Sequence, residues 1–356
     1  MSTTIADTVV LLRKIVSISS LSKMEDEVAN YLADYLYSKG IKVERIKNNI
    51  VAYNQHYNAE YPTLMLNSHL DTVAPSQDYT FDPLSPDIQE DRVLGLGSND
   101  AGGAVCSLLS VFLQFYKEKM PINLMLVLTT EEEISGQNGM KFLKSRIAKE
   151  ASFAIIGEPT SGRAAIAERG LLVLDGETKG VSSHAAYDFG TNAIYLALDD
   201  INTIRNYNFD RISPIMGKMT PKITMINAGK AHNIVPERCS YVVDIRTTEV
   251  YSHEEIVEML QADIQGTIAP RSLTNTSSAT PLDSPLMDAI TNSEIETFIS
   301  LTTSDWISVD VPAVKMGPGD SLRSHKADEY ILVSELEDIN TKYNKIIKQL
   351  INKYNE

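Results

Sequence analysis

The chain contains a short apolar run that ends in a histidine and an aspartate, Pro62-Thr63-Leu64-Met65-Leu66-Asn67-Ser68-His69-Leu70-Asp71. Runs of about four to eight apolar residues bounded by Gly, Pro or polar residues are typical of buried strands. Similar runs occupy residues 122–128, 152–156 and 312–316, and a helical pattern covers residues 104–117. Alternating strands and helices predict an α/β fold with a mostly parallel sheet flanked by helices.

Potential metal ligands follow these runs along the chain. They are two imidazoles and three carboxylates: His69, Asp100, Glu133, Glu158 and His325. Ligands of parallel sheets bind beyond the carboxyl ends of the strands, so side chains that follow strands can meet at one edge. Nitrogen and carboxylate donors of this kind suit a pair of zinc ions.

Taken alone, the candidate ligands and the acidic residues beside them have simpler structural explanations. Residues two apart on an extended segment point the same way, so Asp71 is expected to accept the ring N–H of His69. Asp100 stands in a glycine-rich approach to a helix, where it could serve only as an N-cap. Glu131 opens a run of three glutamates and is expected to be a solvated side chain.

Composition excludes several classes of partner. The chain has 356 residues, 43% of them hydrophobic, and a formal net charge of −15, which disfavours nucleic acid and anionic membrane surfaces. No apolar stretch approaches the roughly 20 residues of a membrane helix, and the N-terminal residues do not resemble a secretory signal. Because Cys106 and Cys239 are expected to be free thiols, we expect a cytoplasmic protein.

The middle of the chain has a different pattern. Strands are expected at residues 164–179, 222–227, 241–247 and 271–273, with helices at 191–207 and 253–265. The order β-α-β-β-α-β is that of a ferredoxin-like unit. We therefore expect this unit to be inserted at residues 163–275 into a first domain formed by residues 1–162 and 276–356.

Five motifs in this order resemble the M20 family of zinc aminoacylases and peptidases. They are His69-Leu70-Asp71-Thr72-Val73, Gly97-Ser98-Asn99-Asp100, Thr130-Glu131-Glu132-Glu133, Gly157-Glu158-Pro159-Thr160 and Gly317-Pro318-Gly319-Asp320, followed by His325. The resemblance covers essentially the whole chain. It implies a zinc aminopeptidase-like catalytic domain with an inserted lid and dimerisation domain, and hence a homodimer through the lid.

The same resemblance implies a role for each motif residue. Asp100 would bridge two divalent ions, with His69 and Glu158 completing one site and Glu133 and His325 the other. The ions would be Zn²⁺, although such ligands also accept Co²⁺ or Mn²⁺. Glu132 would be the general base and Asp71 the aspartate behind His69. Ala101 departs from relatives that have a bulkier residue there.

Three residues of the inserted unit resemble lid residues of the family. His184, in Gly180-Val181-Ser182-Ser183-His184, resembles a histidine that reaches the active site of a partner subunit. Asn233 and Arg246 resemble residues that contact substrate, and Arg246 could bind a carboxylate through two parallel hydrogen bonds. The alternatives are a surface histidine for His184 and, for Arg246, a structural ion pair with Asp244 or Glu249.

The resemblance is greatest to acetylornithine deacetylases and succinyl-diaminopimelate desuccinylases. It implies an enzyme that removes the acyl group from a small N-acyl amino acid, with acetylornithine and arginine biosynthesis as the first expectation. Succinyl-diaminopimelate, succinylornithine, succinylcitrulline and acetylcitrulline remain alternative substrates, and a dipeptidase is a further alternative. A non-enzymatic relative that binds metal is disfavoured because such a protein has no need of Glu132.

Overall fold

The computed structural model of the protein describes residues 4–187 and 189–355. By their internal contacts these residues form two compact units. One contains the described residues up to Ile166, Thr280–Phe298 and the described residues from Ser304 onward; the other contains Ala167–Ala279 and Ile299–Thr303. The chain therefore leaves the first unit, forms the second and returns. Strands β8 (Ala164–Glu168) and β16 (Thr297–Ser300) span the boundary between them.

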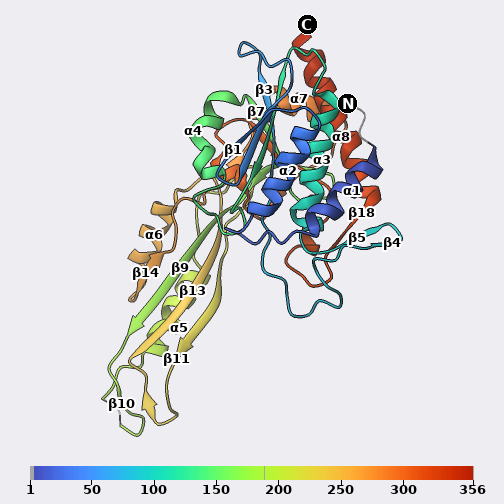
Figure 1. The fold of residues 1–356 in the computed structure, drawn as a ribbon. Helices are drawn as coiled ribbons and strands as arrows, with labels where there is room; N and C mark the ends of the chain where they lie inside the picture. The colour runs from blue at the N-terminus through green and yellow to red at the C-terminus, as the bar shows by residue number, and fades with distance from the viewer. Residues whose placement is uncertain (1–3, 188, 356) are drawn as a thin grey trace. The chain divides into compact units, whose positions relative to one another are not determined.

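A buried sheet forms the centre of the first unit, as expected from the apolar runs (Figure 1). Its middle strands are β6 (Asn123–Thr129), β3 (Thr63–His69), β7 (Phe153–Ile156) and β17 (Ala313–Lys315), which are parallel neighbours in that order. Antiparallel strands β1 (Val43–Ile46), β2 (Asn49–Tyr53) and β8 flank them. Every residue of β3 and β6 is buried, which is typical of strands covered on both faces.

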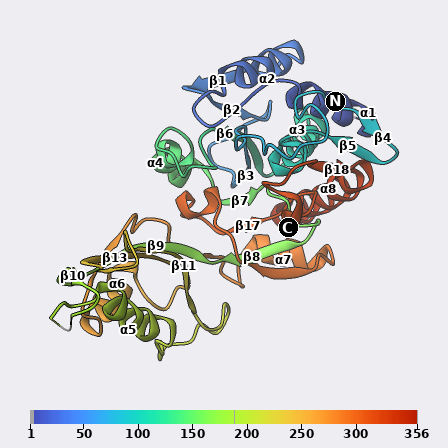
Figure 2. The same ribbon diagram turned by 90° about the horizontal axis from the view of Figure 1, so that it is seen from below.

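Helices cover both faces of this sheet, and consecutive strand residues belong to different clusters. Leu64 and Leu66 pack in the core formed with helices α1 (Ile5–Val16), α2 (Asp26–Ser38), α3 (Gly103–Phe115), α7 (Pro285–Asn292) and α8 (Val333–Asn355). Met65 packs on the opposite face with α4 (Met140–Glu150) and the short helix η2 (Asp305–Ser308). Figure 2 shows α4 on the other side of the strands from α3 and α8. The mostly parallel α/β fold is confirmed.

A small three-stranded sheet brings a distant segment close to the start of α3. It consists of β4 (Ile88–Gln89), β5 (Arg92–Leu94) and β18 (Tyr330–Leu332). The main-chain N–H of Gly95 donates to the carbonyl of Glu329, 2.9 Å away. Residues just after β5 and just before β18 are thus neighbours, which matters for the site described below.

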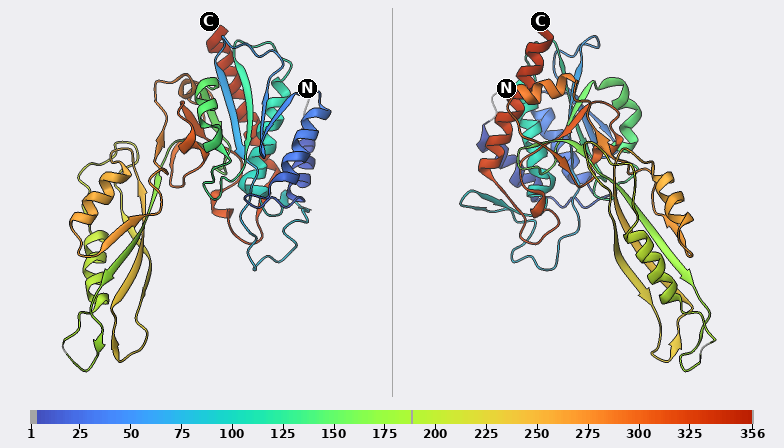
Figure 3. Two further views of the ribbon diagram at one scale, coloured as in Figure 1. Left: turned by 60° about the vertical axis from the view of Figure 1, so that its left-hand side comes forward. Right: turned by 180° about the vertical axis from the view of Figure 1, so that it is seen from behind.

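The second unit has an antiparallel sheet with strand order β11-β13-β9-β14. Its elements are β9 (Gly170–Lys179), β10 (Ser183–His184), α5 (Ala193–Arg205), β11 (Pro221–Ala228), β12 (Ile234–Val235), β13 (Arg238–Thr247), α6 (His253–Ala262), β14 (Thr267–Pro270) and β15 (Ser278–Ala279). Both helices pack against the sheet through a separate core (Figure 3). The order β9-α5-β11-β13-α6-β14 is that of a ferredoxin-like unit.

Two sequence expectations for this region were wrong. The expected strand at residues 164–179 is broken at Arg169, whose main-chain N–H donates to the carbonyl of Ser300, so β8 and β9 join different sheets. The expected strand at residues 271–273 lies instead at Thr267–Pro270, where it pairs with β9. The partners of these segments, Ser300 for Arg169 and β9 for β14, are distant in the sequence, so the local pattern does not reveal them. Among the described residues, no helix is long and apolar enough to cross a membrane.

Candidate metal centre

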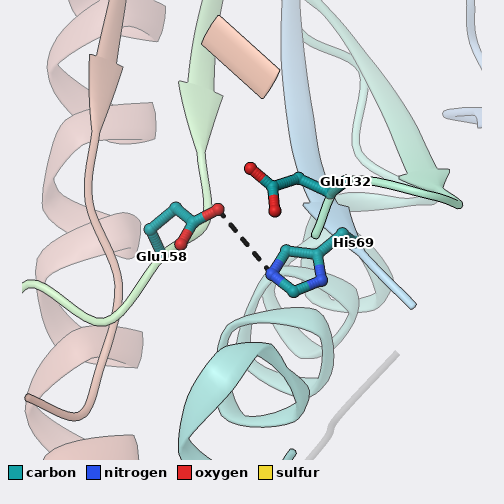
Figure 4. A group of neighbouring side chains, drawn as sticks. All are labelled: His69, Glu132 and Glu158. Carbon is teal, nitrogen blue, oxygen red and sulfur yellow. Dashed lines mark ion pairs between the residues drawn. The ribbon is translucent and has the colours of Figure 1, made fainter. Parts of the chain in front are cut away.

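The candidate ligands of the first unit gather at the carboxyl edge of the parallel strands. His69 is the last residue of β3, Glu132 and Glu133 follow β6, and Glu158 follows β7 by two residues. Because β3 is parallel to both β6 and β7, these strand ends share one edge. In Figure 4 the carboxylates of Glu132 and Glu158 both lie beside the His69 ring.

Asp100 lies between two histidines. Its Oδ1 is 3.2 Å from Nε2 of His69, and its Oδ2 is 3.8 Å from Nε2 of His325. Glu158 Oε1 lies 3.7 Å from His69 Nε2, and Glu133 Oε2 lies 2.9 Å from His325 Nε2. One carboxylate that presents a different oxygen to each of two imidazoles has the arrangement of a bridging ligand.

The donor atoms are close enough to share ions. Those of His69, Glu132 and Glu158 lie within 4.8 Å of one another, and so do those of His69, Asp100 and Glu133. Imidazole nitrogen and carboxylate oxygen are the donors that zinc and other divalent transition metals accept in proteins. The residues therefore fit a metal centre, and the chain has candidate metal-ligand groups.

The electrostatics of the cluster favour the binding of a cation. Burial raises the pKa of Glu158 to about 8, and burial together with the charge of Glu158 holds the pKa of Glu132 well above its ordinary value. The hydrogen bond from His325 to Glu133 raises the pKa of His325 to about 9. Like charges crowded in a buried space take up protons unless a cation compensates them.

The ring orientation of His69 is fixed by the main chain. Nδ1 lies 2.9 Å from the carbonyl oxygen of Asp71 and 3.5 Å from its carboxylate. Because a carbonyl only accepts, Nδ1 carries a hydrogen, and Nε2 is the nitrogen that faces Asp100 and Glu158 and has a lone pair in the neutral ring. The expected orientation of His69 by residue 71 is present, but the closer partner is the carbonyl and not the side chain.

The Asp71 carboxylate instead holds the glutamate turn. Its oxygens accept hydrogen bonds from the main-chain N–H of Glu132 at 3.0 Å, from that of Glu133 at 3.1 Å, and from the Ser22 hydroxyl at 2.7 Å. Residues 132–135 form a turn shortly after β6, and Glu132 and Glu133 belong to different groups of donor atoms that share His69. Both side chains contribute to the same cluster.

For the neighbouring acidic residues, one expectation was wrong and one alternative is excluded. Glu131 is buried, not solvated, because its carboxylate accepts hydrogen bonds from the main chain and side chain of Asn138. Asp100 is not the N-cap of α3, which begins at Gly103 after Gly102. Asp100 lies in the preceding turn, η1 (Ser98–Gly102), with a non-helical backbone at φ −123° and ψ 96°.

Sequence analysis missed one residue beside this turn. The Glu329 carboxylate accepts the main-chain N–H groups of Gly97, Asn99 and Asp100, and its side chain is buried. In the sequence it ends a polar run, Lys326-Ala327-Asp328-Glu329, that reads as a solvated loop. The only available signal was its place directly before the apolar residues of β18.

The lid candidates all lie in the second unit. His184 in β10 and Asn233 beside β12 are brought together, because His184 pairs with Ile234 and the Asn233 carbonyl accepts the N–H of Ala185. Arg246 in β13 makes two hydrogen bonds with the Asp244 carboxylate, at 3.0 and 3.1 Å. The ion pair considered as an alternative for Arg246 is therefore present.

A buried parallel sheet with histidine and carboxylate side chains clustered at its carboxyl edge is the architecture of metal-binding hydrolases. The profile of "Peptidase family M20/M25/M40" matches residues 65–349, which is most of the chain. The chain belongs to this family, and it is a hydrolase of the peptidase or desuccinylase type.

Individual relatives are similar over nearly the full length of the chain. A probable carboxypeptidase of Paracoccidioides brasiliensis (strain Pb03) is 27% identical, with 94% of this chain and 83% of the relative covered. A succinyl-diaminopimelate desuccinylase of Wolbachia pipientis wMel is 24% identical, with 98% and 95% covered. A tripeptidase from Staphylococcus aureus has the same fold, with a TM-score of 0.80, 20% identity and coverage of 99% and 100%.

Metal binding to the metal-free protein should become weaker as the pH falls. A metal ion must displace the proton that His325 holds below a pKa of about 9, so affinity for Co²⁺ should fall by about tenfold per pH unit for each proton displaced. Chelator competition between about pH 6 and pH 9 measures the affinity, and calorimetry in buffers of different ionisation enthalpy counts the protons. His325→Asn should release fewer protons; pH-independent affinity in the unaltered protein would exclude His325 as a ligand.

Proposed function

We propose that this chain is a metal-dependent amidohydrolase that removes the N-acyl group from a small N-acylated amino acid. The observation that carries the proposal is the position of Glu132, whose carboxylate lies with the ligand atoms of His69 and Glu158 within 4.8 Å. Asp100 adjoins them through His69. A carboxylate at a metal centre that already has enough ligands is free to move protons.

The ligands divide into two sets around Asp100. His69 and Glu158 would hold one ion and Glu133 and His325 the other, as their distances to the two histidines suggest. We propose zinc, with cobalt or manganese as possible substitutes. Bound in this way, divalent ions supply Lewis acidity, which makes water nucleophilic at neutral pH and stabilises negative charge on the amide oxygen.

Glu132 is the proposed general base. Burial and the charge of Glu158 raise the pKa of Glu132, and bound cations would lower it again, so that the ionised carboxylate can accept a proton from the attacking water. The same carboxyl group can then deliver this proton to the leaving amine. Asp71 holds the Glu132 main chain through a 3.0 Å hydrogen bond and so limits movement of the base.

His184 is the proposed hydrogen-bond donor to the amide oxygen. Its Nδ1 accepts the N–H of Ala186 at 3.1 Å, so in the neutral ring the hydrogen is on Nε2. The ring is exposed and can donate from Nε2 to a developing oxyanion. Asn233 beside it and Arg246, whose guanidinium is oriented by Asp244, are proposed to bind the substrate, Arg246 through a carboxylate.

A homodimer through the second unit is proposed because that unit presents apolar side chains on an unpaired edge. β11 is the end strand of its sheet, and its Met225 and Ile226 are 54% and 50% exposed. On α5, Tyr195 and Leu198 are 67% and 51% exposed. Exposed edge strands with apolar residues are templates for pairing with another chain. His184 would then act in the partner's site.

Acetylornithine is the proposed substrate, which would place the enzyme in arginine biosynthesis in the cytoplasm. Acetylcitrulline, succinylated ornithine or citrulline, and succinyl-diaminopimelate are the alternatives, the last supported by the similarity to a desuccinylase. Hydrolysis of small peptides is a second candidate function, because the chain shares its fold over 99% of its length with a tripeptidase. Both reactions use the same metal centre and base.

A substrate panel tests this assignment. The zinc-loaded protein should hydrolyse acetylornithine with the highest kcat/KM among acetylornithine, acetylcitrulline, succinylornithine, succinyl-diaminopimelate, dipeptides and tripeptides. Differential contacts in a pocket are worth about tenfold or more in kcat/KM. Faster hydrolysis of a succinyl substrate would move the assignment within the deacylases, and faster hydrolysis of the peptides would replace it with a peptidase.

Replacement of Glu132 by Gln should abolish turnover while the metal stays bound. Loss of a general acid–base typically lowers kcat by about 10²–10⁴-fold. Steady-state kinetics and metal analysis of the same sample measure both quantities. The neighbouring Glu131→Gln is a matched control, because Glu131 bonds to Asn138 and should affect stability more than kcat. Turnover of Glu132→Gln within a few fold of the unaltered protein would sink the assignment of the base.

Action of His184 across a dimer can be tested by mixing two inactive chains. In a heterodimer of His184→Ala and Glu132→Gln chains, one site has an intact Glu132 together with the intact His184 of the other chain. Such heterodimers, purified through two different tags, should recover about half of the activity of the unaltered dimer. No recovery in confirmed heterodimers would count against donation in trans.

A further inference from the structure

We propose that Glu329 is a positioning residue that sets the turn carrying Asp100 into its metal-binding conformation before metal arrives. The inference rests on the proposed role of Asp100 as the bridging ligand and not on the identity of the substrate. Glu329 lies four residues after His325 and 229 residues after Asp100 in the chain. Its carboxylate therefore joins the segments that supply two of the ligands.

The Glu329 carboxylate accepts three main-chain hydrogen bonds from one turn. Oε1 accepts the main-chain N–H groups of Asn99 and Asp100, each at 2.9 Å, and Oε2 accepts that of Gly97 at 3.0 Å. Only 3% of Glu329 is exposed. A carboxyl group that accepts three main-chain N–H groups restrains the peptide units that carry them, and here these units belong to one turn.

The turn needs such an anchor because its sequence does not favour one conformation. Residues 95–103 read Gly-Leu-Gly-Ser-Asn-Asp-Ala-Gly-Gly, and glycines lose the most conformational freedom on folding. Gly97 has a positive φ of 72°, and the non-helical backbone of Asp100 keeps this residue outside α3. Two main-chain hydrogen bonds close the turn, from the N–H groups of Gly102 and Gly103 to the carbonyls of Gly97 and Ser98, and neither uses a peptide group of Asp100. The N–H of Asp100 itself donates to the Glu329 carboxylate.

A second set of hydrogen bonds connects the same turn to the segment that contains His325. The Asn99 side chain donates to the carbonyl of Asp320 at 3.1 Å and accepts the N–H of Asp320 at 2.9 Å. It also donates to the hydroxyl of Ser324 at 3.3 Å. Asn99 and Glu329 thus bind the turn to residues on both sides of His325. Asp100 and His325 are held in one hydrogen-bonded unit.

This arrangement predicts an effect on metal affinity that stability alone does not produce. If the turn is ordered in the metal-free protein, metal binding does not have to order it. Without Glu329, part of the free energy of metal binding is used to order the turn. The affinity for both ions then falls, because Asp100 faces both His69 and His325. Loss of partners that orient metal ligands typically lowers metal affinity by about 10–100-fold.

The test compares Glu329→Gln and Glu329→Ala with a buried carboxylate of the second unit. Asp200 is 1% exposed and accepts the main-chain N–H groups of Gln265 and Gly266, each at 2.9 Å, so Asp200→Asn is a matched control. Affinity for Co²⁺ is measured by chelator competition on the metal-free, full-length proteins, and the free energy of unfolding is measured by denaturant titration. Glu329→Gln, which keeps one oxygen acceptor, guards against loss of folding in Glu329→Ala.

We expect Glu329→Gln to weaken Co²⁺ binding by about 10–100-fold, with activity recovering toward that of the unaltered protein at saturating metal. Asp200→Asn should lower stability and leave Co²⁺ affinity unchanged. The proposal is overturned if Glu329→Gln binds Co²⁺ as tightly as the unaltered protein, or if Asp200→Asn weakens binding equally. Failure of the unaltered protein to bind Co²⁺ would instead refute the proposed metal centre itself.

Discussion

The site depends on one carboxylate placed between two imidazoles. Asp100 can face both His69 and His325 only if the turn after β5, the end of β3 and the loop after β17 are held at the same edge. Crowding several carboxylates around it in a buried space is electrostatically unfavourable, as the raised pKa values of Glu132 and Glu158 indicate. The parallel sheet fixes the strand ends and so keeps these carboxylates close together despite their repulsion. A divalent cation would neutralise that repulsion.

Main-chain N–H groups complete this rigidity. Asp71 binds the turn of Glu132 and Glu133, and Glu329 binds the turn of Asp100. In each case a buried carboxylate that is not a proposed ligand fixes the backbone of one that is. Hydrogen bonds to their peptide units restrict the conformations of the proposed ligand side chains, in addition to the restriction from side-chain packing.

Sequence patterns were sufficient for the fold class and for the buried parallel strands of the first unit, and the candidate ligands that follow those strands lie close together, because apolar runs and the residues at their ends carry local signals. They were insufficient where a partner is distant in the chain. Glu131 was expected to be solvated, N-capping was open as an alternative role for Asp100, and Glu329 was not noticed, since the position of each depends on hydrogen bonds or burial created by tertiary contacts. The break at Arg169 likewise follows from a contact with Ser300.

The division of the first unit along the chain has a consequence for its synthesis. β7 is complete by Ile156, but its parallel neighbour β17 begins only at Ala313, after the whole second unit has emerged. During synthesis, β7 therefore lacks its neighbour β17 until the second unit has been translated. His325 arrives later still. The proposed metal centre therefore includes a residue that is synthesised only after the whole second unit.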